Sequence, residues 1–294
     1  MSRPQPDQAD GLRRLLTVPA PRVIAVAGMT RGAGTTAIAM NLSAALREQG
    51  RPVLLLDEHG TSAQSACALW SIEPHGALAD AASGQLGGDA AAQAACGIRV
   101  LPVAGGLAED GFDVRSLCPA GVVVIDAAFG AAGQLSALAR QADELVIVMQ
   151  PVPASITQTY AGLKRLHRAY AIEKFRFLLN GVTSAGQAQR IMANIIETAS
   201  RYLAVSLQAA GWVRFDPLLQ AATRLKQPVA QAYPNSPAAE DFRRLALEIG
   251  SWPAPAPAPA PAPASAARAC APAAAGPSAV TARGAGAAPS PIAA

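Results

Sequence analysis

Cysteine, aromatic residues and charge are all scarce in this chain. Aromatics make up 4% of the sequence, charged residues 15%, and the four cysteines include no Cys-x-x-Cys pair and accompany no histidine cluster. This usage argues against a disulfide framework or a structural zinc site, and it is typical of incidental thiols in a reducing compartment. The net charge is only +4 and no basic stripe carries interleaved aromatics, so a nucleic-acid partner is not expected.

Two further absences concern membranes and export. The polar start of the chain does not have the character of a signal peptide, and no uninterrupted apolar run reaches membrane-spanning length. We therefore expect a cytoplasmic protein, with peripheral contact at the inner membrane or the cell pole as an open alternative.

Three regions differ in composition. Residues 1–20 form a short polar lead with one helical stretch, and residues 21–252 alternate apolar runs with amphipathic segments. Residues 253–294 are Ala-Pro repeats followed by Ala, Ser, Gly and Pro, a composition that buries no core and favours extended polyproline II. The sequence predicts a partner-binding helix, one folded domain and a disordered tail.

The domain shows continuous apolar runs separated by helical patterns. Runs without polar alternation are typical of strands buried on both faces of a parallel sheet. Alternation of strand and helix then predicts an α/β fold with a doubly wound, mostly parallel sheet flanked by helices. The predicted strands are Arg22–Ala27, Pro52–Leu56, Ile98–Val103, Gly121–Ile125, Glu144–Met149 and Phe175–Leu179, and helices are predicted around Ile38–Leu46 and Ile156–Leu166.

A glycine-rich turn follows the first predicted strand and precedes a helix. Such a turn directs backbone N–H groups toward an anion, and the helix dipole adds positive potential, so we expect a phosphate-binding loop. Thr36 stands where a P-loop places its Mg²⁺-binding hydroxyl. The predicted nucleotide-binding residues of this turn are Gly28, Arg31, Gly32, Ala33, Gly34, Thr35 and Thr36.

This turn resembles the deviant Walker A motif of the MinD/ParA-type P-loop ATPases, which reads K-G-G-x-G-K-[ST]. In that alignment both lysines are absent, replaced by Thr30 and Thr35, and Arg31 replaces the first glycine. In the family one lysine binds the phosphates and the other reaches across a dimer. The resemblance implies ATP or ADP with Mg²⁺ bound about ten- to a hundred-fold more weakly, hydrolysis slower by ~10³ or more, and poor ATP-dependent homodimerisation. A slow but genuine ATPase that uses Arg31 is the alternative.

Six more positions are interpreted through the same resemblance. Asp57 ends the second strand as a Mg²⁺ ligand, while His59 stands where the family places the aspartate that positions water. Asp126, with Gly130 four residues on, resembles Walker B and switch II, and Asp126 is expected to hold Mg²⁺ through water. Asn180 either reads adenine or caps its strand. The remaining predicted nucleotide-binding residue, in a loop near the base, is Asp216.

The N-terminal lead narrows the resemblance. Residues 7–13 read DQADGLR and fit the D-Q-A-x-x-L-R segment of the FlhG family of MinD-like flagellar number regulators. In that family the segment binds the flagellar GTPase FlhF, which is of the signal-recognition-particle type, and stimulates GTP hydrolysis. Flagellar basal-body proteins are further implied partners. An N-terminal helix that packs on its own domain is the alternative. The predicted partner-binding residues are Asp7, Gln8, Ala9, Leu12 and Arg13.

An amphipathic helix is predicted at 236–252, begun by Ser236 as N-cap and Pro237 at N1. Its apolar stripe either touches a membrane, as in FlhG-like proteins, or packs on the domain. The polar face, with Glu240, Asp241 and Glu248 beside two arginines, is not basic, so attraction to anionic lipid is weak. An accessory protein of cellulose secretion is the alternative function, against which the D-Q-A-x-x-L-R segment argues.

Overall fold

The computed structural model describes residues 21–60, 62–83, 91–103, 112–130, 132–203 and 205–253. The predicted partner-binding residues Asp7, Gln8, Ala9, Leu12 and Arg13 lie outside these ranges, and so do residues 254–294 of the tail.

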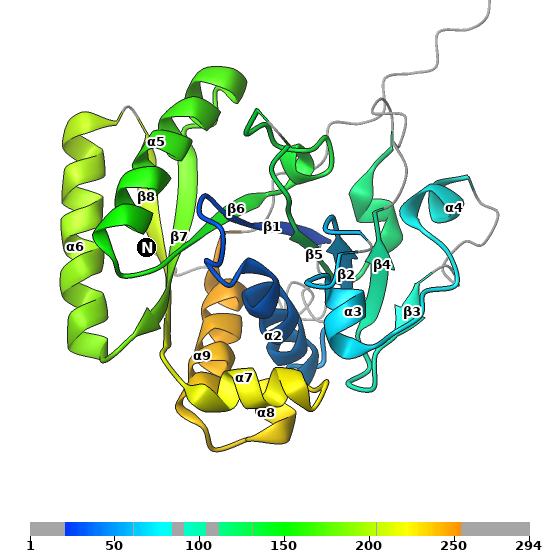
Figure 1. Ribbon diagram of the computed structural model, residues 1–294. Helices are drawn as coiled ribbons and strands as arrows, with labels where there is room; N and C mark the ends of the chain where they lie inside the picture. Colours follow the sequence, from blue (N-terminus) through cyan, green and yellow to red (C-terminus); the bar gives the residue numbers. More distant parts are fainter. Residues whose placement is uncertain are drawn as a thin grey trace, which may run out of the picture. The chain divides into compact units, whose positions relative to one another are not determined.

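An eight-stranded sheet forms the centre of the described domain (Figure 1). The strand order is β3-β4-β2-β5-β1-β6-β7-β8, and every neighbouring pair is parallel except β3 with β4. This confirms the predicted doubly wound α/β fold. The strands are β1 (Arg22–Gly28), β2 (Val53–Asp57), β3 (Ala92–Gln93), β4 (Arg99–Pro102), β5 (Val122–Asp126), β6 (Glu144–Met149), β7 (Lys174–Val182) and β8 (Ser206–Arg214).

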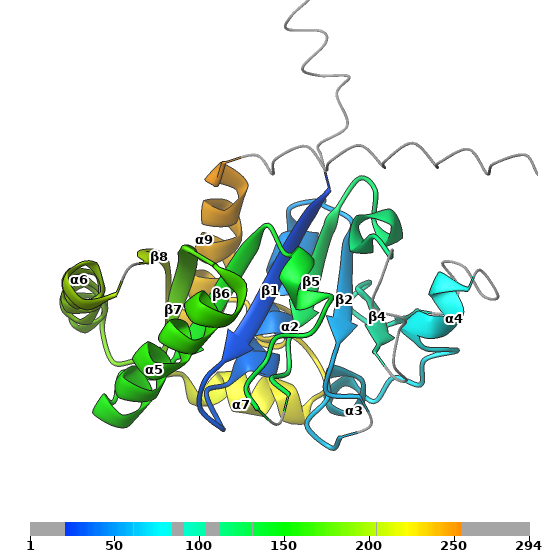
Figure 2. The same ribbon diagram turned by 90° about the horizontal axis from the view of Figure 1, so that it is seen from above.

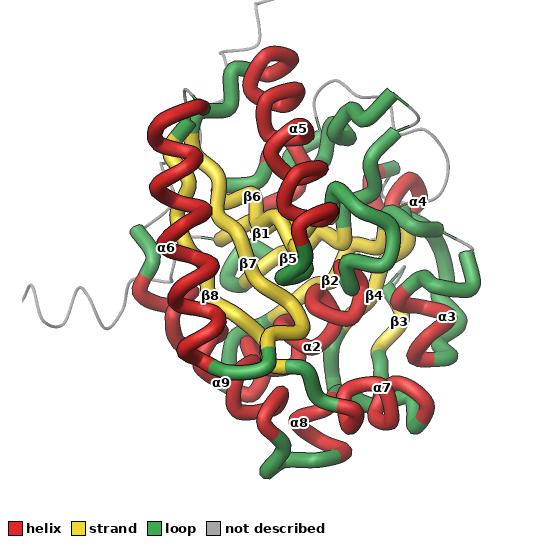
Figure 3. Tube along the Cα trace, turned by 60° about the vertical axis from the view of Figure 1, so that its left-hand side comes forward, coloured by secondary structure: helices red, strands yellow, loops and turns green. Residues whose placement is uncertain are grey.

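Helices cover both faces of the sheet (Figure 2). One apolar core joins the first face to α2 (Thr35–Glu48), α3 (Ala66–Trp70), α7 (Pro217–Arg224), α8 (Val229–Ala232) and α9 (Pro237–Ser251). The other core joins the second face to α4 (Leu78–Ala82), α5 (Pro153–Tyr170), α6 (Ala185–Tyr202) and two 3₁₀ turns, Val114–Leu117 and Ala139–Gln141. Figure 3 shows the strands as a yellow layer between these helices.

The central strands explain why the apolar runs are continuous. In β1, Ile24 and Val26 belong to the first core, while Val23, Ala25 and Ala27 belong to the second, and all five are buried. A strand buried on both faces has no solvent side that a polar residue can occupy.

Helix α9 packs its apolar stripe on its own domain. Phe242, Leu245, Ile249 and Trp252 are all buried in the first core, against α2 and β8. Of the two alternatives for this stripe, the structure has domain packing. None of the described helices is both long and apolar enough to cross a bilayer.

The sequence interpretation of Asp241 as a residue of the exposed polar face is wrong. Its side chain is fully buried between α9 and the end of β8, where Oδ2 accepts hydrogen bonds from the backbone N and Nε of Arg214, each at 2.8 Å. Arg244 lies 2.9 Å from Oδ1. The carboxylate raises the pKa of Arg214 far above its usual value, so this pair keeps its charges and ties α9 to the sheet.

Candidate nucleotide site

The glycine-rich turn lies between β1 and α2, at the carboxyl end of the sheet, where doubly wound folds bind their ligands. Gly32 and Gly34 have φ values of +78° and +86°, which a side chain opposes. Gly34 is the N-cap of α2 and supplies no side-chain acceptor. The first N–H groups of α2 therefore remain available to an anion, together with the positive end of the helix dipole.

Side chains from neighbouring strands and helices hold the turn in place. Asn180, near the end of β7, donates its Nδ2 hydrogen to the carbonyl of Ala33 at 2.8 Å. Gln150, after β6, donates to the carbonyl of Gly32 at 3.3 Å, and the Thr30 hydroxyl lies 3.4 Å from that of Ser155 in α5. Asn180 is thus a brace for the phosphate loop, a role that neither sequence alternative included.

Substituting Gly34 is expected to disturb this cradle more than substituting Gly32. An alanine Cβ at 34 meets Asn180 Nδ2 at 2.4 Å, whereas at 32 it meets nothing within 4 Å. Gly32→Ala is expected to lower the free energy of unfolding by about 1 kcal/mol, because alanine is disfavoured in the left-handed backbone conformation. Gly34→Ala adds the loss of the Asn180 hydrogen bond, for a total of about 2 kcal/mol. Urea denaturation of both variants measures the difference, and equal stability losses contradict this view of Asn180.

A cavity of about 1170 Å³ opens in front of the turn. The turn Gly28–Ala37, the segment after β2 and the segment after β5 line it, joined by Gly162 and Arg165 of α5. The structure therefore brings together most of the predicted residues: Gly28, Thr30, Arg31, Gly32, Ala33, Gly34, Thr35, Thr36, His59 and Gly130 all line this cavity.

Among the described residues that line the cavity, the ionisable ones are Arg31, Arg165 and His59, and none is acidic. Asp57 and Asp126 are fully buried behind it, at paired positions of β2 and β5. The surface that faces the cavity is therefore suited to a polyanion.

Asp57 and Asp126 differ in how their oxygens are satisfied. Asp57 accepts backbone hydrogen bonds from His59 at 3.0 Å and Cys67 at 3.3 Å. Both oxygens of Asp126 lack a hydrogen-bond partner among the described residues. His59 Nε2 lies 3.5 Å from Asp126 Oδ1, an ion-pair distance without hydrogen-bond geometry, and this carboxylate raises the pKa of His59. A buried carboxylate without partners calls for a neighbouring cation.

These residues fit Mg²⁺ in part. The bare oxygens of Asp126 and the hydroxyl of Thr36, which lines the cavity, are the hard donors that Mg²⁺ accepts alongside phosphate and water. Asp57, predicted as a third ligand, has both oxygens engaged by backbone N–H groups. His59 Nε2, 3.5 Å from Asp126 Oδ1, lies beside the same carboxylate.

Sequence reasoning missed Glu58. Its Oε2 accepts a hydrogen bond from the backbone N of Ala128 at 3.0 Å, and its Oε1 accepts one from the Ser136 hydroxyl. Burial raises the pKa of this carboxyl. Glu58 thereby fastens the end of β2 to the segment after β5, which contains the predicted switch residue Gly130.

Asp216 lies away from the cavity and is a helix cap. Oδ1 accepts from Leu218 N at 2.9 Å, at the start of α7, and Oδ2 accepts from Ala238 N at 3.1 Å, at the start of α9. Neither Asp216 nor Asn180 is among the residues that line the cavity.

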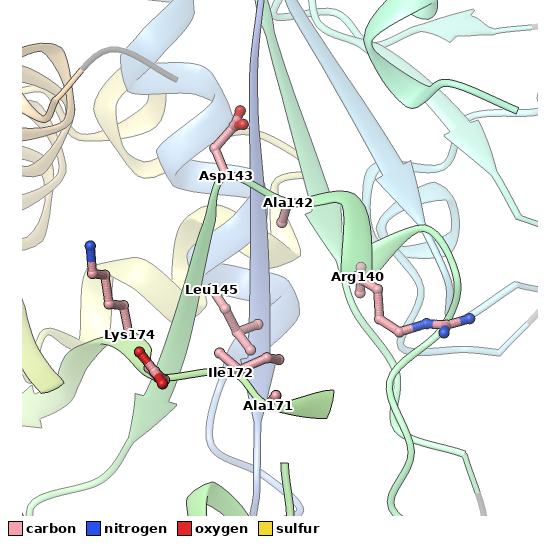
Figure 4. Close-up of a pocket in the computed structure, with 9 residues that line it drawn as sticks. Arg140, Ala142, Asp143, Leu145, Ala171, Ile172 and Lys174 are labelled. Atoms are coloured by element: carbon pink, nitrogen blue, oxygen red, sulfur yellow. The ribbon is translucent and has the colours of Figure 1, made fainter. Parts of the chain in front are cut away.

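A second cavity, of about 330 Å³, lies at the amino ends of β6 and β7, opposite the glycine-rich turn (Figure 4). The carboxylate of Asp143 already accepts from Val23 N at 2.8 Å and pairs with Arg115, and the Arg140 guanidinium lies over the Tyr170 ring. Two of its charged side chains are thus engaged within the protein, and the larger cavity, which the glycine-rich turn lines, is the better candidate site.

The chain is 30% identical over 246 residues to the antiactivator FleN of Pseudomonas aeruginosa, a match that covers 79% of this chain and 87% of FleN. No protein-family profile matches the chain.

Solved structures share the fold at lower identity. The cell division ATPase MinD of Pyrococcus furiosus matches with a TM-score of 0.56 and 22% identity over 78% of this chain and 98% of MinD. MinD from the MinC:MinD complex of Aquifex aeolicus has a TM-score of 0.60 and 17% identity over 80% of this chain and 98% of its own. MinD of Pyrococcus horikoshii, solved with Mg-ADP, has a TM-score of 0.56 and 21% identity over 79% of this chain and 96% of that MinD.

Proposed function

The chain belongs to the family of the antiactivator FleN, with the fold of the MinD/ParA-type P-loop ATPases, and from this we propose that it regulates flagellar number or placement. The observation that carries the proposal is the 30% identity to FleN across 87% of that protein. The same match favours a flagellar role over the cellulose-secretion alternative.

In this proposal residues 21–252 bind ATP or ADP but turn over very little. The cradle of backbone N–H groups is in place, which supports binding, while Thr30 and Thr35 supply no positive charge to phosphate. Mg²⁺, held by Thr36 and Asp126, neutralises phosphate charge when bound. We expect weakened affinity and no strong nucleotide-driven homodimer.

The regulatory output of the proposal resides in residues 1–20, which act on the GTPase FlhF, and flagellar basal-body proteins are further proposed partners. Nucleic acid is not a proposed partner. We place the protein in the cytoplasm, at the inner membrane or cell pole through its partners. Direct membrane contact by α9 requires its buried stripe to leave the domain.

Stimulation of FlhF should depend on Gln8 and Leu12 in different ways. A glutamine that approaches a GTPase site orients the attacking water, so Gln8→Ala in the full-length chain is expected to lower the GTP hydrolysis rate while binding persists. Leu12→Ala removes an apolar anchor and is expected to lose binding. The measurement is GTP turnover by FlhF, with affinity determined in parallel.

A peptide of residues 1–20 and a chain lacking residues 1–18 are the matched controls. The peptide alone should stimulate, and the shortened chain should not. If the peptide is inert and the shortened chain stimulates as well as the full chain, the motif has no role in this interaction and the FlhF partnership is wrong.

A further inference from the structure

One face of α5 is turned toward the phosphate loop. Ser155 lies by Thr30, and Gly162, two turns further on, sits so close to Met29 that a Cβ at 162 meets its sulfur at 2.3 Å. Residues three or four apart share a helix face, so Arg165 continues the same face over the cavity. Figure 2 shows α5 beside the carboxyl end of β1.

Arg165 reaches the segment after β5. A Cβ added at Gly133 lies 3.7 Å from the Cζ of Arg165 and 3.8 Å from each of its two terminal nitrogens. The guanidinium therefore lines the cavity where the segment after β5 borders it, beside Gly133.

Nothing in the described part of the chain neutralises this arginine. Arg165 is exposed, and no described carboxylate forms an ion pair with it. The described residues of the cavity wall include no acidic side chain. A planar guanidinium on the wall of the cavity that the glycine-rich turn also lines matches the oxygens of a phosphate group.

We propose that Arg165 binds the terminal phosphate of the nucleotide and supplies, from α5, positive charge that the glycine-rich turn lacks. This inference rests on the nucleotide binding assigned above to residues 21–252. The positive charge of Arg165 compensates, in nucleotide binding, for the two lysines that Thr30 and Thr35 replace. It is supplied by α5, whereas both replaced lysines belong to the glycine-rich turn. Arg165 stands beside Gly133, in the segment that follows the Mg²⁺ candidate Asp126 at the end of β5. Because Mg²⁺ bridges the β- and γ-phosphates of a bound nucleoside triphosphate, this position favours the last phosphate, and Arg165 thereby discriminates ATP from ADP.

The test is calorimetric titration of the full-length protein with ATP, ADP and tripolyphosphate in Mg²⁺. Arg165→Gln is expected to weaken ATP and tripolyphosphate binding about ten- to a hundred-fold, the effect of losing hydrogen bonds to a charged group, and ADP binding much less. Arg165→Lys should recover part of the affinity. Lys164→Gln removes the same charge from the adjacent exposed position and should change affinity no more than about fivefold.

The assignment is overturned if the wild type does not bind ATP, or if Arg165→Gln and Lys164→Gln weaken ATP binding equally. It is also overturned if Arg165→Gln weakens ATP and ADP binding equally, or if ATP affinity falls only in a further variant, Arg31→Gln. Thermal melting of each variant confirms that the fold is kept. FlhF stimulation by the wild type, measured on the same preparations, separates the two proposals. Retained stimulation without ATP binding overturns both the nucleotide binding assigned to residues 21–252 and the role of Arg165, and leaves the FlhF role standing. ATP binding that does not depend on Arg165 overturns the role of Arg165 alone, and Arg165-dependent ATP binding without stimulation overturns the FlhF role alone.

Discussion

The Thr30→Lys, Thr35→Lys, His59→Asp variant is expected to hydrolyse ATP about 10³-fold faster than the unchanged chain, since a cation in the transition state contributes at least that factor in related phosphoryl transfers. The scaffold for this gain is present: the turn carries its glycine conformations, and Asp126 has two oxygens without a hydrogen-bond partner among the described residues. His59→Asp also removes the imidazole that stands 3.5 Å from Asp126. Phosphate release from the full-length protein is the measurement.

The control for this experiment separates a degenerate site from a slow enzyme. Arg31→Gln in the otherwise unchanged chain removes the one cation within the turn itself. If the unchanged chain turns over as fast as the triple variant, and Arg31→Gln abolishes that turnover, the protein is a genuine ATPase that uses Arg31 and our interpretation of Thr30 and Thr35 is wrong.

Asp241→Ala is expected to lower the free energy of unfolding by about 3 kcal/mol, the lower end of the range for breaking a buried ion pair. The carboxylate is fully buried and accepts two hydrogen bonds from Arg214, one of them from the backbone. The lower end applies because the Arg214 side chain is 29% exposed and reaches water once its partner is gone. Urea denaturation followed by circular dichroism measures the loss.

Glu240→Ala offers the matched comparison one residue away. Glu240 also pairs with Arg214, at 2.9 Å, but its side chain is 63% exposed, and an exposed pair contributes less than about 1 kcal/mol. Similar losses from the two variants show that burial of Asp241 does not determine the strength of its pairing.

The sequence pattern predicted the centre of the sheet and missed the strands at both edges, β3 and β8; β3 has only two residues, too few to form a pattern. The six predicted strands all occur, because strands buried on both faces have continuous apolar runs. Strand β8 was missed because it is an edge strand in which only Leu207, Ala210 and Val213 are buried, three residues apart, so it has neither a continuous apolar run nor a strict alternation. Register shifts against β7 interrupt it as well. Helix α6 was not predicted, although its sequence has a helical pattern: Ala188, Met192, Ile195 and Ala199 are buried at helical spacing.

The candidate site was predictable where one local segment builds it and not where distant segments meet. The glycine-rich turn is local, and its predicted residues line one cavity. Glu58 was missed because its partner Ala128 lies 70 residues away, and no spacing rule joins them. Asp57 and Asp216 were interpreted by motif position, whereas the structure employs their oxygens to hold backbone N–H groups.

The buried stripe of α9 changes how a truncation of this chain must be interpreted. Phe242, Leu245 and Ile249 complete the core that also holds α2, the helix that starts at the glycine-rich turn. Deleting 236–252 therefore exposes α2, and a mislocalised or aggregated truncation reports misfolding as readily as a lost membrane anchor. Leu247, 67% exposed on the outer side of α9, is where the two can be told apart, because its substitution by a charged residue leaves the core intact while weakening any contact with lipid.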